Sequence, residues 1–378
     1  MNPDDIFLFG PLAEPGVLSA VLGRGGAPLI QTASRGQLDG KVAVWSPGAR
    51  VAQLRDAEGR AVPGLLLRDV GLEMRRRLNY FLSGVAKWGQ VRVLHAGMAV
   101  DVEAPIALMQ AGNAPEFDAA WNNGPWAAAM VEAAGEYMHN YGKWPAPRAA
   151  GLWHAMLIRA GARARARAAD GPATLRNPQG PEAVQVLDQR RPYVDYFAVE
   201  EHDLRFPRFD GTMSDPVHRA TFVDGDAVIV LPYDPVRDRV LLVEQFRMGP
   251  FVRGDRRPWL LEAVAGRVDG AEPPRDAALR ELAEETGLTA ARLVDVAHFY
   301  PSSGAVTAFF YNFVALVDLP DGVAGVHGVE NEAEDIRGHV VSFDKAMALV
   351  ASGEAASGPL VTLLFWLENR RGDLAAHA

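Results

Sequence analysis

The chain has 378 residues, no cysteine, and 38 Lys and Arg against 47 Asp and Glu, which gives a formal charge of −9. The lack of cysteine excludes disulfides, thiol nucleophiles and thiolate metal sites. The acidic balance argues against broad nucleic-acid binding, so an anionic substrate would need metal ions to supply positive charge. Asp4 and Asp5 at the start of the chain are unlike a secretory signal, and no apolar run approaches the roughly 18 residues of a membrane span. We expect a cytoplasmic protein with no membrane partner and no nucleic-acid partner.

Three stretches of different composition predict the domain organisation. Residues 1–105 mix short strand-like runs with Gly-rich turns and one helix over 71–84, which is typical of a small α+β domain. Residues 106–189 lose the strand signal and become Ala-rich, so we expect a helical connector ending in a Pro- and Gly-rich linker. Strand signals return afterwards. Residues 190–378 therefore form a second α+β domain.

The second domain reads as a mixed sheet with helices on its faces. A hairpin is predicted over 227–247, and an apolar strand over 258–266 follows it. Pro273 and Pro274 are placed to open a helix, and Gly287 is placed to end it in a left-handed C-cap. The remaining elements are strands at 293–300, 308–317 and 338–343 and helices at 343–353 and 358–371.

The helix opened by the two prolines carries three carboxylates on one side. Glu281, Glu284 and Glu285 stand at positions i, i+3 and i+4, where like charges repel. A solvated acidic face is the simpler interpretation of such a trio taken alone. A hard divalent cation such as Mg²⁺, which prefers oxygen ligands, is the alternative, since Arg280 can neutralise only part of the charge.

The wider spacing favours the metal. The segment GRVDGAEPPRDAALRELAEETGL fits the pattern of G, five residues, E, seven residues, RE, two residues, EE, one residue and G. Seven fixed residues coincide by chance at roughly 10⁻⁸ to 10⁻⁹ per starting position. The segment resembles the Nudix hydrolase signature at Gly266, Glu272, Arg280, Glu281, Glu284, Glu285 and Gly287.

The resemblance implies the chemistry and the residues that carry it. Runs such as LPYDPVRDRVLLVEQFR, PWLLEAVAG and GVHGVENEAEDIRGHVV are similar to the ADP-ribose pyrophosphatase branch over roughly 210–370. That branch implies hydrolysis of a nucleoside diphosphate linked to another moiety, with Mg²⁺ as cofactor and Mn²⁺ able to substitute. The implied metal ligands are Glu281, Glu285, Glu334 and the backbone carbonyl of Ala265.

The same resemblance assigns the other site residues. Glu332 is the candidate general base, Arg247 and Glu262 are the candidate substrate contacts, and Glu284 and Arg280 belong to the catalytic group. Arg280 would orient the helix, together with Glu272, rather than react. Glu330, Glu332, Glu334 and Asp335 taken alone would read as a charged surface loop.

The expected substrate is ADP-ribose or a related nucleoside diphosphate sugar, with GDP-mannose or NADH as alternatives. A stress-response module that senses a nucleotide without cleaving it remains a further alternative, although the intact signature argues against it. The branch also implies a homodimer, for which strands around Tyr196 to Arg219 would serve. One loop departs from the branch: SSGAVTA places Ser303 where a proline is usual and Ala308 where a glutamate is usual. This departure affects the expected substrate more than the expected reaction.

The first domain resembles γ-glutamylcyclotransferase-like domains through Phe9-Gly10-Pro11-Leu12 and RLNYFLSG. The resemblance implies a small barrel-like fold. Its catalytic glutamate would fall on Leu82, which cannot transfer a proton, so we expect an inactive domain. A fusion of this kind is similar to proteins described as tellurite-resistance associated. In the connector, Arg159, Arg163 and Arg167 share a helical face that we expect to be solvated and salt-bridged.

Overall fold

The computed structural model describes residues 4–110, 112–122, 126–327 and 335–376. The chain divides into two compact units. The first comprises residues 1–178 and 194–197, and the second comprises residues 179–193 and 198–378. Within the described residues, no helix combines the length and the apolar character needed to cross a membrane.

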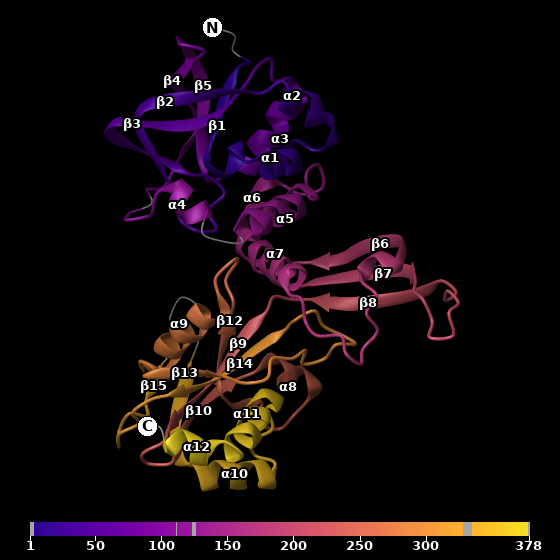
Figure 1. Cartoon of the computed structure of the whole chain (residues 1–378), viewed down its shortest axis with the longest axis vertical. Helices are drawn as coiled ribbons and strands as arrows, with labels where there is room; N and C mark the ends of the chain where they lie inside the picture. Colours follow the sequence, from indigo (N-terminus) through magenta and orange to yellow (C-terminus); the bar gives the residue numbers. More distant parts are fainter. Residues whose placement is uncertain (1–3, 111, 123–125, 328–334, 377–378) are drawn as a thin grey trace. The chain divides into compact units, whose positions relative to one another are not determined.

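A closed five-stranded barrel forms the centre of the first unit, with strand order β1-β3-β2-β4-β5 (Figure 1). Its first strand is buried at all four positions, as expected for the apolar run IFLF. The strand-like run VRVLHAGMAV at 91–100 spans the end of β4, a tight turn and the start of β5, so it is the turn region of a hairpin. The strands are β1 (Ile6–Phe9), β2 (Ser34–Val44), β3 (Gln53–Leu67), β4 (Ala86–His95) and β5 (Met98–Ala107).

Helices cover the barrel and continue beyond it. The helix predicted over 71–84 is confirmed as α3, whereas α1 and α2 were not predicted because their short, Gly-flanked sequences lack a helical period. The two Ala-rich stretches each form a pair of helices. The bounds are α1 (Pro15–Leu22), α2 (Ala27–Gln31), α3 (Leu72–Leu82), α4 (Phe117–Asn122), α5 (Trp126–Met138), α6 (Ala146–Gly151) and α7 (Trp153–Ala168), with 3₁₀ turns at Gly10–Ala13 and Arg24–Gly26.

The predicted connector shares the core of the barrel unit. Tyr137 of α5 and Met156 of α7 are buried in the same cluster as Phe7 and Phe81. The arginine face of α7 is salt-bridged as predicted, but it is not solvated throughout: Arg159 is buried and bonds Glu136 at 2.6 Å. A buried Arg needs such a partner, because an isolated charge is costly to desolvate. The domain boundaries 1–105, 106–189 and 190–378 remain a prediction.

A three-stranded antiparallel sheet precedes the large sheet of the second unit. It has the order β6-β7-β8 and follows the stretch that was predicted as a linker. Its strands expose several large apolar side chains, among them Val186, Leu187, Tyr193 and Phe222. The bounds are β6 (Gln185–Val194), β7 (Ala198–Arg205) and β8 (Val217–Val223), after a 3₁₀ turn at Pro181–Ala183.

The second unit is built on an eight-stranded sheet within the described residues, with order β13-β14-β9-β10-β16-β15 and with β11 and β12 paired to β10 and β9. It is a mixed sheet, since β14 runs parallel to β9 and the other pairs are antiparallel. The single strand predicted over 258–266 is wrong in one respect: it is two strands with different neighbours. The bounds are β9 (Ala227–Asp234), β10 (Arg239–Phe246), β11 (Trp259–Glu262), β12 (Val264–Arg267), β13 (Arg292–Asp295), β14 (Phe310–Leu316), β15 (Val326–His327) and β16 (Ile336–Ser342).

Helices cover both faces of this sheet, as predicted (Figure 1). Alternate residues of β9 point to opposite faces: Ile229 packs against α10 and α11, whereas Val228 and Val230 pack against α9. The sheet is therefore buried on both sides. The helix bounds are α8 (Met248–Arg253), α9 (Pro274–Thr286), α10 (Phe343–Ser352), α11 (Gly358–Glu368) and α12 (Arg371–Ala375).

Candidate active site

Helix α9 is positioned by signals at both of its ends. Pro274 is its first residue and Pro273 its N-cap, where a missing N–H costs nothing. Gly287 ends it with φ of 68°, a left-handed conformation that glycine adopts without strain. Ala277 and Leu282 are fully buried against the sheet. The opposite side of the helix is thereby fixed as the side that carries the charged residues.

The three carboxylates of α9 occupy different environments. Glu285 is buried, with an exposed fraction of 2%, and the side chain of Glu281 is 13% exposed. Glu284 is 41% exposed at its side chain. A uniformly solvated acidic face is therefore wrong, because two of the three carboxylates face the protein. Buried carboxylates require compensating positive charge or hydrogen-bond donors.

Gly266 leaves the space that Glu281 occupies. A Cβ atom at Gly266 would lie 1.8 Å from Cδ of Glu281 and about as close to both its oxygens. No side chain fits at that distance, so glycine here is a requirement of close packing between β12 and α9. Gly266 and Glu281, two signature residues 15 positions apart in sequence, are thus in direct contact.

Arg280 links the carboxylates of the signature. Its Nη1 donates to Glu281 at 2.7 Å and to Glu284 at 3.0 Å. Its Nη2 and Nε donate to the two oxygens of Glu272 at 3.0 and 3.2 Å, and Nη2 also donates to the Arg267 carbonyl. Burial alone would lower the pKa of Arg280, but the hydrogen bond to Glu272 and the charge of Glu281 outweigh it and raise the pKa. Arg280 is therefore a permanent cation that holds these carboxylates in place.

A pocket of about 370 Å³ lies beside this constellation. Arg247 follows β10 and Glu262 ends β11, and Nε of Arg247 donates to Glu262 at 2.6 Å. The two candidate substrate contacts thus come together at the wall of the pocket. The lining residues are Asp224, Gly225, Ala227, Ile229, Arg247, Glu262, Ala263, Ala265, Gly266, Arg267, Ala308, Phe310, Ser357 and Pro359.

Several lining residues were not found from the sequence. Arg267 pairs with Asp224 at 2.5 Å, across the loop that leads into β9. Ser357 precedes α11 and lies about 90 residues further along the chain than Arg267. Arg267 directly follows the signature residue Gly266, which is a weak indication that it lies at the site. No motif marks Asp224 or Ser357. Only the folded sheet brings these segments to one place. The loop departure also bears on the pocket, because Ala308 is buried in its wall.

The described residues supply some, but not all, of the oxygen ligands expected for a hard cation. Glu281 and Glu285 lie one helical turn apart, and Ala265 lines the pocket next to Gly266. These are oxygen donors, the kind Mg²⁺ prefers. Glu332 and Glu334 fall within 328–334 and so lie outside the described residues. Among the described residues, no three acidic or histidine side chains are gathered in a way that would hold a metal, and this includes the carboxylates of α9.

Known proteins are similar to this half of the chain. Residues 224–364 match the family model described as NUDIX domain. The ADP-ribose pyrophosphatase of Escherichia coli (strain K12) is 37% identical over 189 residues, which cover 50% of this chain and 90% of that protein. The chain belongs to the Nudix family. The Haemophilus influenzae ADP-ribose pyrophosphatase is 34% identical over 187 residues, covering 49% of this chain and 86% of that protein.

A relative with another named substrate also matches. The GDP-mannose pyrophosphatase of Yersinia pestis (strain Pestoides F) is 30% identical over 170 residues, covering 45% of this chain and 84% of that protein. These alignments leave about half of the chain unmatched. The Nudix domain is therefore accompanied by further sequence, which includes residues outside 224–364.

Proposed function

We propose that the Nudix domain hydrolyses the pyrophosphate bond of ADP-ribose or a related nucleoside diphosphate sugar, giving a nucleoside monophosphate and a sugar phosphate. The observation that carries the proposal is the meeting of Gly266, Ala265 and the Arg247–Glu262 pair at one pocket, directly beside the carboxylates of α9. The named activities of the Escherichia coli and Haemophilus influenzae relatives support the choice of substrate.

A divalent cation, Mg²⁺ or in its place Mn²⁺, would be held by Glu281, Glu285 and the Ala265 carbonyl, with Glu334 as a further ligand. Bound there, it would neutralise phosphate charge and lower the pKa of an attacking water. Arg280 keeps Glu281 oriented through its hydrogen bond at 2.7 Å. Burial of Glu285 fixes that carboxylate in one place. Glu332 would take the proton of the water as general base.

The Arg247–Glu262 pair would receive the substrate. The Nη groups of Arg247 make no hydrogen bond to any residue in the described part of the chain, and its side chain is 37% exposed. They can therefore donate to a phosphate without losing an existing bond, while Glu262 holds the Nε side of the guanidinium. The carboxylate of Glu262 would also accept from the adenosine end of the substrate.

The decisive experiment compares substrates on pure protein. ADP-ribose, GDP-mannose, NADH and a nucleoside triphosphate are each incubated with Mg²⁺, and the products are separated by chromatography. We expect AMP and ribose 5-phosphate from ADP-ribose, with slower turnover of the others. Faster cleavage of GDP-mannose would move the substrate to that class, which the Yersinia pestis relative already represents. No turnover of any of them, with tight nucleotide binding, would establish a sensor.

The chain would act as a homodimer through its three-stranded sheet. Tyr193 and Tyr196 are 55% and 54% exposed, at the end of β6 and just after it, and Val186 and Leu187 near the start of β6 are also exposed. Exposed apolar side chains on a small antiparallel sheet are suited to pairing with a second copy. Sedimentation at working concentration tests this: a mass near 82 kDa, about twice the chain mass of 40.8 kDa, is expected, and a monomer contradicts it.

The first unit would carry a cyclotransferase-like fold without the reaction. Leu82 ends α3 and is buried with 2% exposure, so the position of the expected acid holds an aliphatic side chain inside the core. We expect no 5-oxoproline from γ-glutamyl peptides or γ-glutamyl amines. Its detection by chromatography, at a rate that exceeds a heat-inactivated control, would contradict this part of the proposal.

A further inference from the structure

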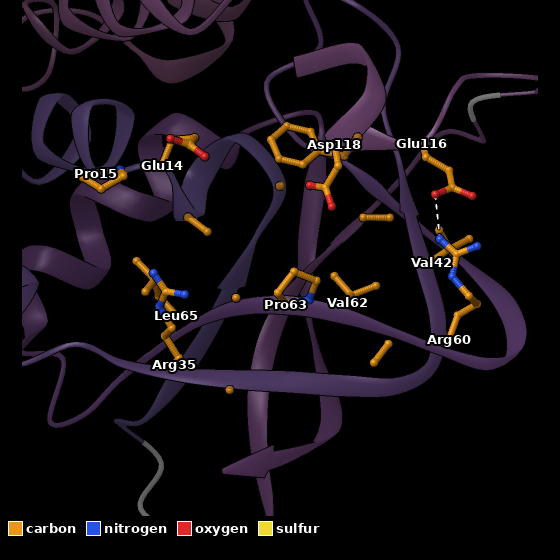
Figure 2. Close-up of a pocket in the computed structure, with 17 residues that line it drawn as sticks. Glu14, Pro15, Arg35, Val42, Arg60, Val62, Pro63, Leu65, Glu116 and Asp118 are labelled. Atoms are coloured by element: carbon orange, nitrogen blue, oxygen red, sulfur yellow. Dashed lines mark hydrogen bonds and ion pairs between the residues drawn. The ribbon is translucent and has the colours of Figure 1, made fainter. Parts of the chain in front are cut away.

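The barrel unit contains a pocket of its own, far in sequence from the Nudix signature. It has a volume of about 430 Å³ and is formed by the start of α1, the strands β2 and β3, and the start of α4 (Figure 2). The lining residues are Gly10, Ala13, Glu14, Pro15, Arg35, Gly36, Val42, Ala43, Arg60, Ala61, Val62, Pro63, Gly64, Leu65, Glu116, Phe117 and Asp118. Nothing in the proposed pyrophosphatase reaction uses these residues.

Two carboxylates of the pocket have no partner in the described residues. Glu14 is the N-cap residue of α1, yet its side chain accepts no capping hydrogen bond. Asp118 is exposed in the first turn of α4 and likewise forms no ion pair there. Burial raises the pKa of Glu14, and the charge of Asp118 raises it further. The two groups are close enough to repel each other, so a cation placed between them would be stabilised.

The cations of the pocket do not meet this demand. Arg60 donates to Glu116 at 2.7 Å, and these two charges neutralise each other. In Figure 2, Glu14 and Asp118 lie along one side of the pocket, and Arg35 lies along the other, next to Leu65. The side chain of Arg35 forms no ion pair with the described residues. The pocket therefore has an acidic side with unsatisfied negative charge and a far side that would repel a second positive charge.

The floor of the pocket opposite the acidic residues is apolar. Val62 and Pro63 of β3 line it, and in Figure 2 they lie below Glu14 and Asp118 and to the right of Arg35. Val62 is buried, with 2% exposure. A ligand body that contacts this floor would gain from leaving water. We propose that the pocket binds a small organic monocation, a primary amine whose ammonium group lies between Glu14 and Asp118 and whose apolar body covers Val62 and Pro63.

Charge and polarity exclude other ligand classes. A diamine would place its second ammonium group toward Arg35, and an anion would face two unpaired carboxylates at the opposite side. A neutral alcohol of the same shape would lose the charge-assisted hydrogen bonds to the carboxylates, which are stronger than neutral ones. Amine binding at this pocket does not depend on the proposed pyrophosphatase function.

The test uses isothermal titration calorimetry on the full-length chain with four probes. Benzylamine is the matched monocation, benzyl alcohol its neutral counterpart, benzoate its anionic counterpart, and 1,4-diaminobutane the dication. We expect saturable binding of benzylamine at one site, with at least about 10-fold weaker binding of the other three. No saturable binding of benzylamine at millimolar concentration, or equal binding of benzyl alcohol, overturns the proposal.

Variants locate the site. Glu14→Gln and Asp118→Asn should each weaken benzylamine binding at least about 10-fold, because each removes one charged acceptor. Glu58→Gln is the matched control, since it removes one exposed carboxylate from β3 outside the pocket lining, and it should change binding less than 2-fold. Thermal unfolding of each variant checks that the barrel is intact. Unchanged binding in both pocket variants overturns the proposal.

One further titration separates a monocation from a zwitterion. Phenylglycine carries the body of benzylamine together with a carboxylate that Arg35 could bind. If phenylglycine binds more tightly than benzylamine and loses this advantage in Arg35→Met, the assignment to a monocation is wrong. We expect the reverse order, because a carboxylate placed close to the ammonium group would also approach Glu14 and Asp118.

Discussion

Gly266 and the carboxylate of Glu281 occupy what would otherwise be the same space, with only 1.8 Å between Cδ of Glu281 and the position of a Cβ on residue 266. The contact ties the strand that lines the pocket to the helix that carries the acidic residues. It also makes Glu281 the side chain that any larger residue at position 266 must displace.

Gly266→Ala should therefore inactivate the enzyme while leaving it folded. Displacing the Glu281 carboxylate by an ångström or more should lower kcat/KM about 100-fold, because catalytic geometry tolerates little movement. Gly372→Ala is the control, since Gly372 lies in α12 with no atom near its missing Cβ. Steady-state kinetics and circular dichroism are measured on both. Wild-type activity in Gly266→Ala would show that Glu281 is not needed where it lies.

Replacing Glu285 and replacing Glu332 should lower the hydrolytic activity for different reasons. Glu285→Gln should lower metal affinity, so that higher Mg²⁺ partly restores turnover. Glu332→Gln should lower kcat by roughly 10² to 10⁴ with metal binding nearly unchanged, as expected for a lost general base. Activity measured across a Mg²⁺ titration separates the two. If Glu332→Gln keeps wild-type turnover, the base is Glu334 or Glu330 instead.

Arg280 should act as a positioning residue. Lysine cannot reproduce the fork that bonds Glu272, Glu281 and Glu284 at once. Arg280→Lys should therefore cost about 10- to 100-fold in kcat, with a smaller change in KM and a higher Mg²⁺ requirement. Arg275→Lys is the matched control on the same helix, because its partner Asp295 is an exposed carboxylate. Equal losses in the two variants would remove the special role of Arg280.

Asp234 should govern acid stability of the Nudix domain. Its buried carboxylate accepts from the backbone N–H groups of Val236, Arg237 and Leu319 and from the Arg237 guanidinium. Burial alone would raise the pKa of Asp234, but these hydrogen bonds outweigh burial and lower it below the ordinary 3.8. A lowered pKa means that the stabilisation is present above the ordinary value and is lost as the pH falls through the folded-state value.

Asp234→Asn should accordingly cost about 1 to 3 kcal/mol at pH 7, because an amide NH₂ replaces one acceptor oxygen. The loss should shrink below the ordinary pKa of 3.8, because the carboxylate of the unfolded chain then takes up a proton and the wild type loses part of this stabilisation. Urea unfolding at pH 7 and pH 3 measures both effects. Asp318→Asn serves as control, since this partner of Arg237 is 74% exposed. An equal cost at both pH values would contradict the linkage.

Local signals predicted the parts of the site that lie close together in sequence. Pro274 and Gly287 bound α9 as expected, because proline and glycine have position-specific backbone preferences. The different burial of Glu284 and Glu285 could not be predicted, since neighbouring carboxylates look alike until the helix is packed. Likewise, the helical periodicity placed Arg159 on one face with Arg163 and Arg167. The burial of Arg159 could not be predicted, because it depends on Glu136 of α5, 23 residues away in sequence.

The break between β11 and β12 escaped prediction for a different reason. Ala263 lies inside a largely apolar run, and no Asn, Asp or Gly next to it marks a turn where the partner changes. The partners are decided by long-range pairing: Glu262 lies opposite Val243 of β10, whereas Val264 lies opposite Val230 of β9. Sheet register of this kind depends on the assembled fold.

The hairpin of β9 and β10, whose strands separate away from their turn, has a consequence for the order of folding. Strands β9 and β10 are paired directly only next to their turn, at Asp234–Arg239 and Tyr233–Val240. Beyond that they separate and accept residues 259–267 between them. The turn can form early, since its contacts are local, but the pocket exists only after the later segment has inserted. Catalytic competence should therefore appear last during refolding and disappear first during gentle unfolding.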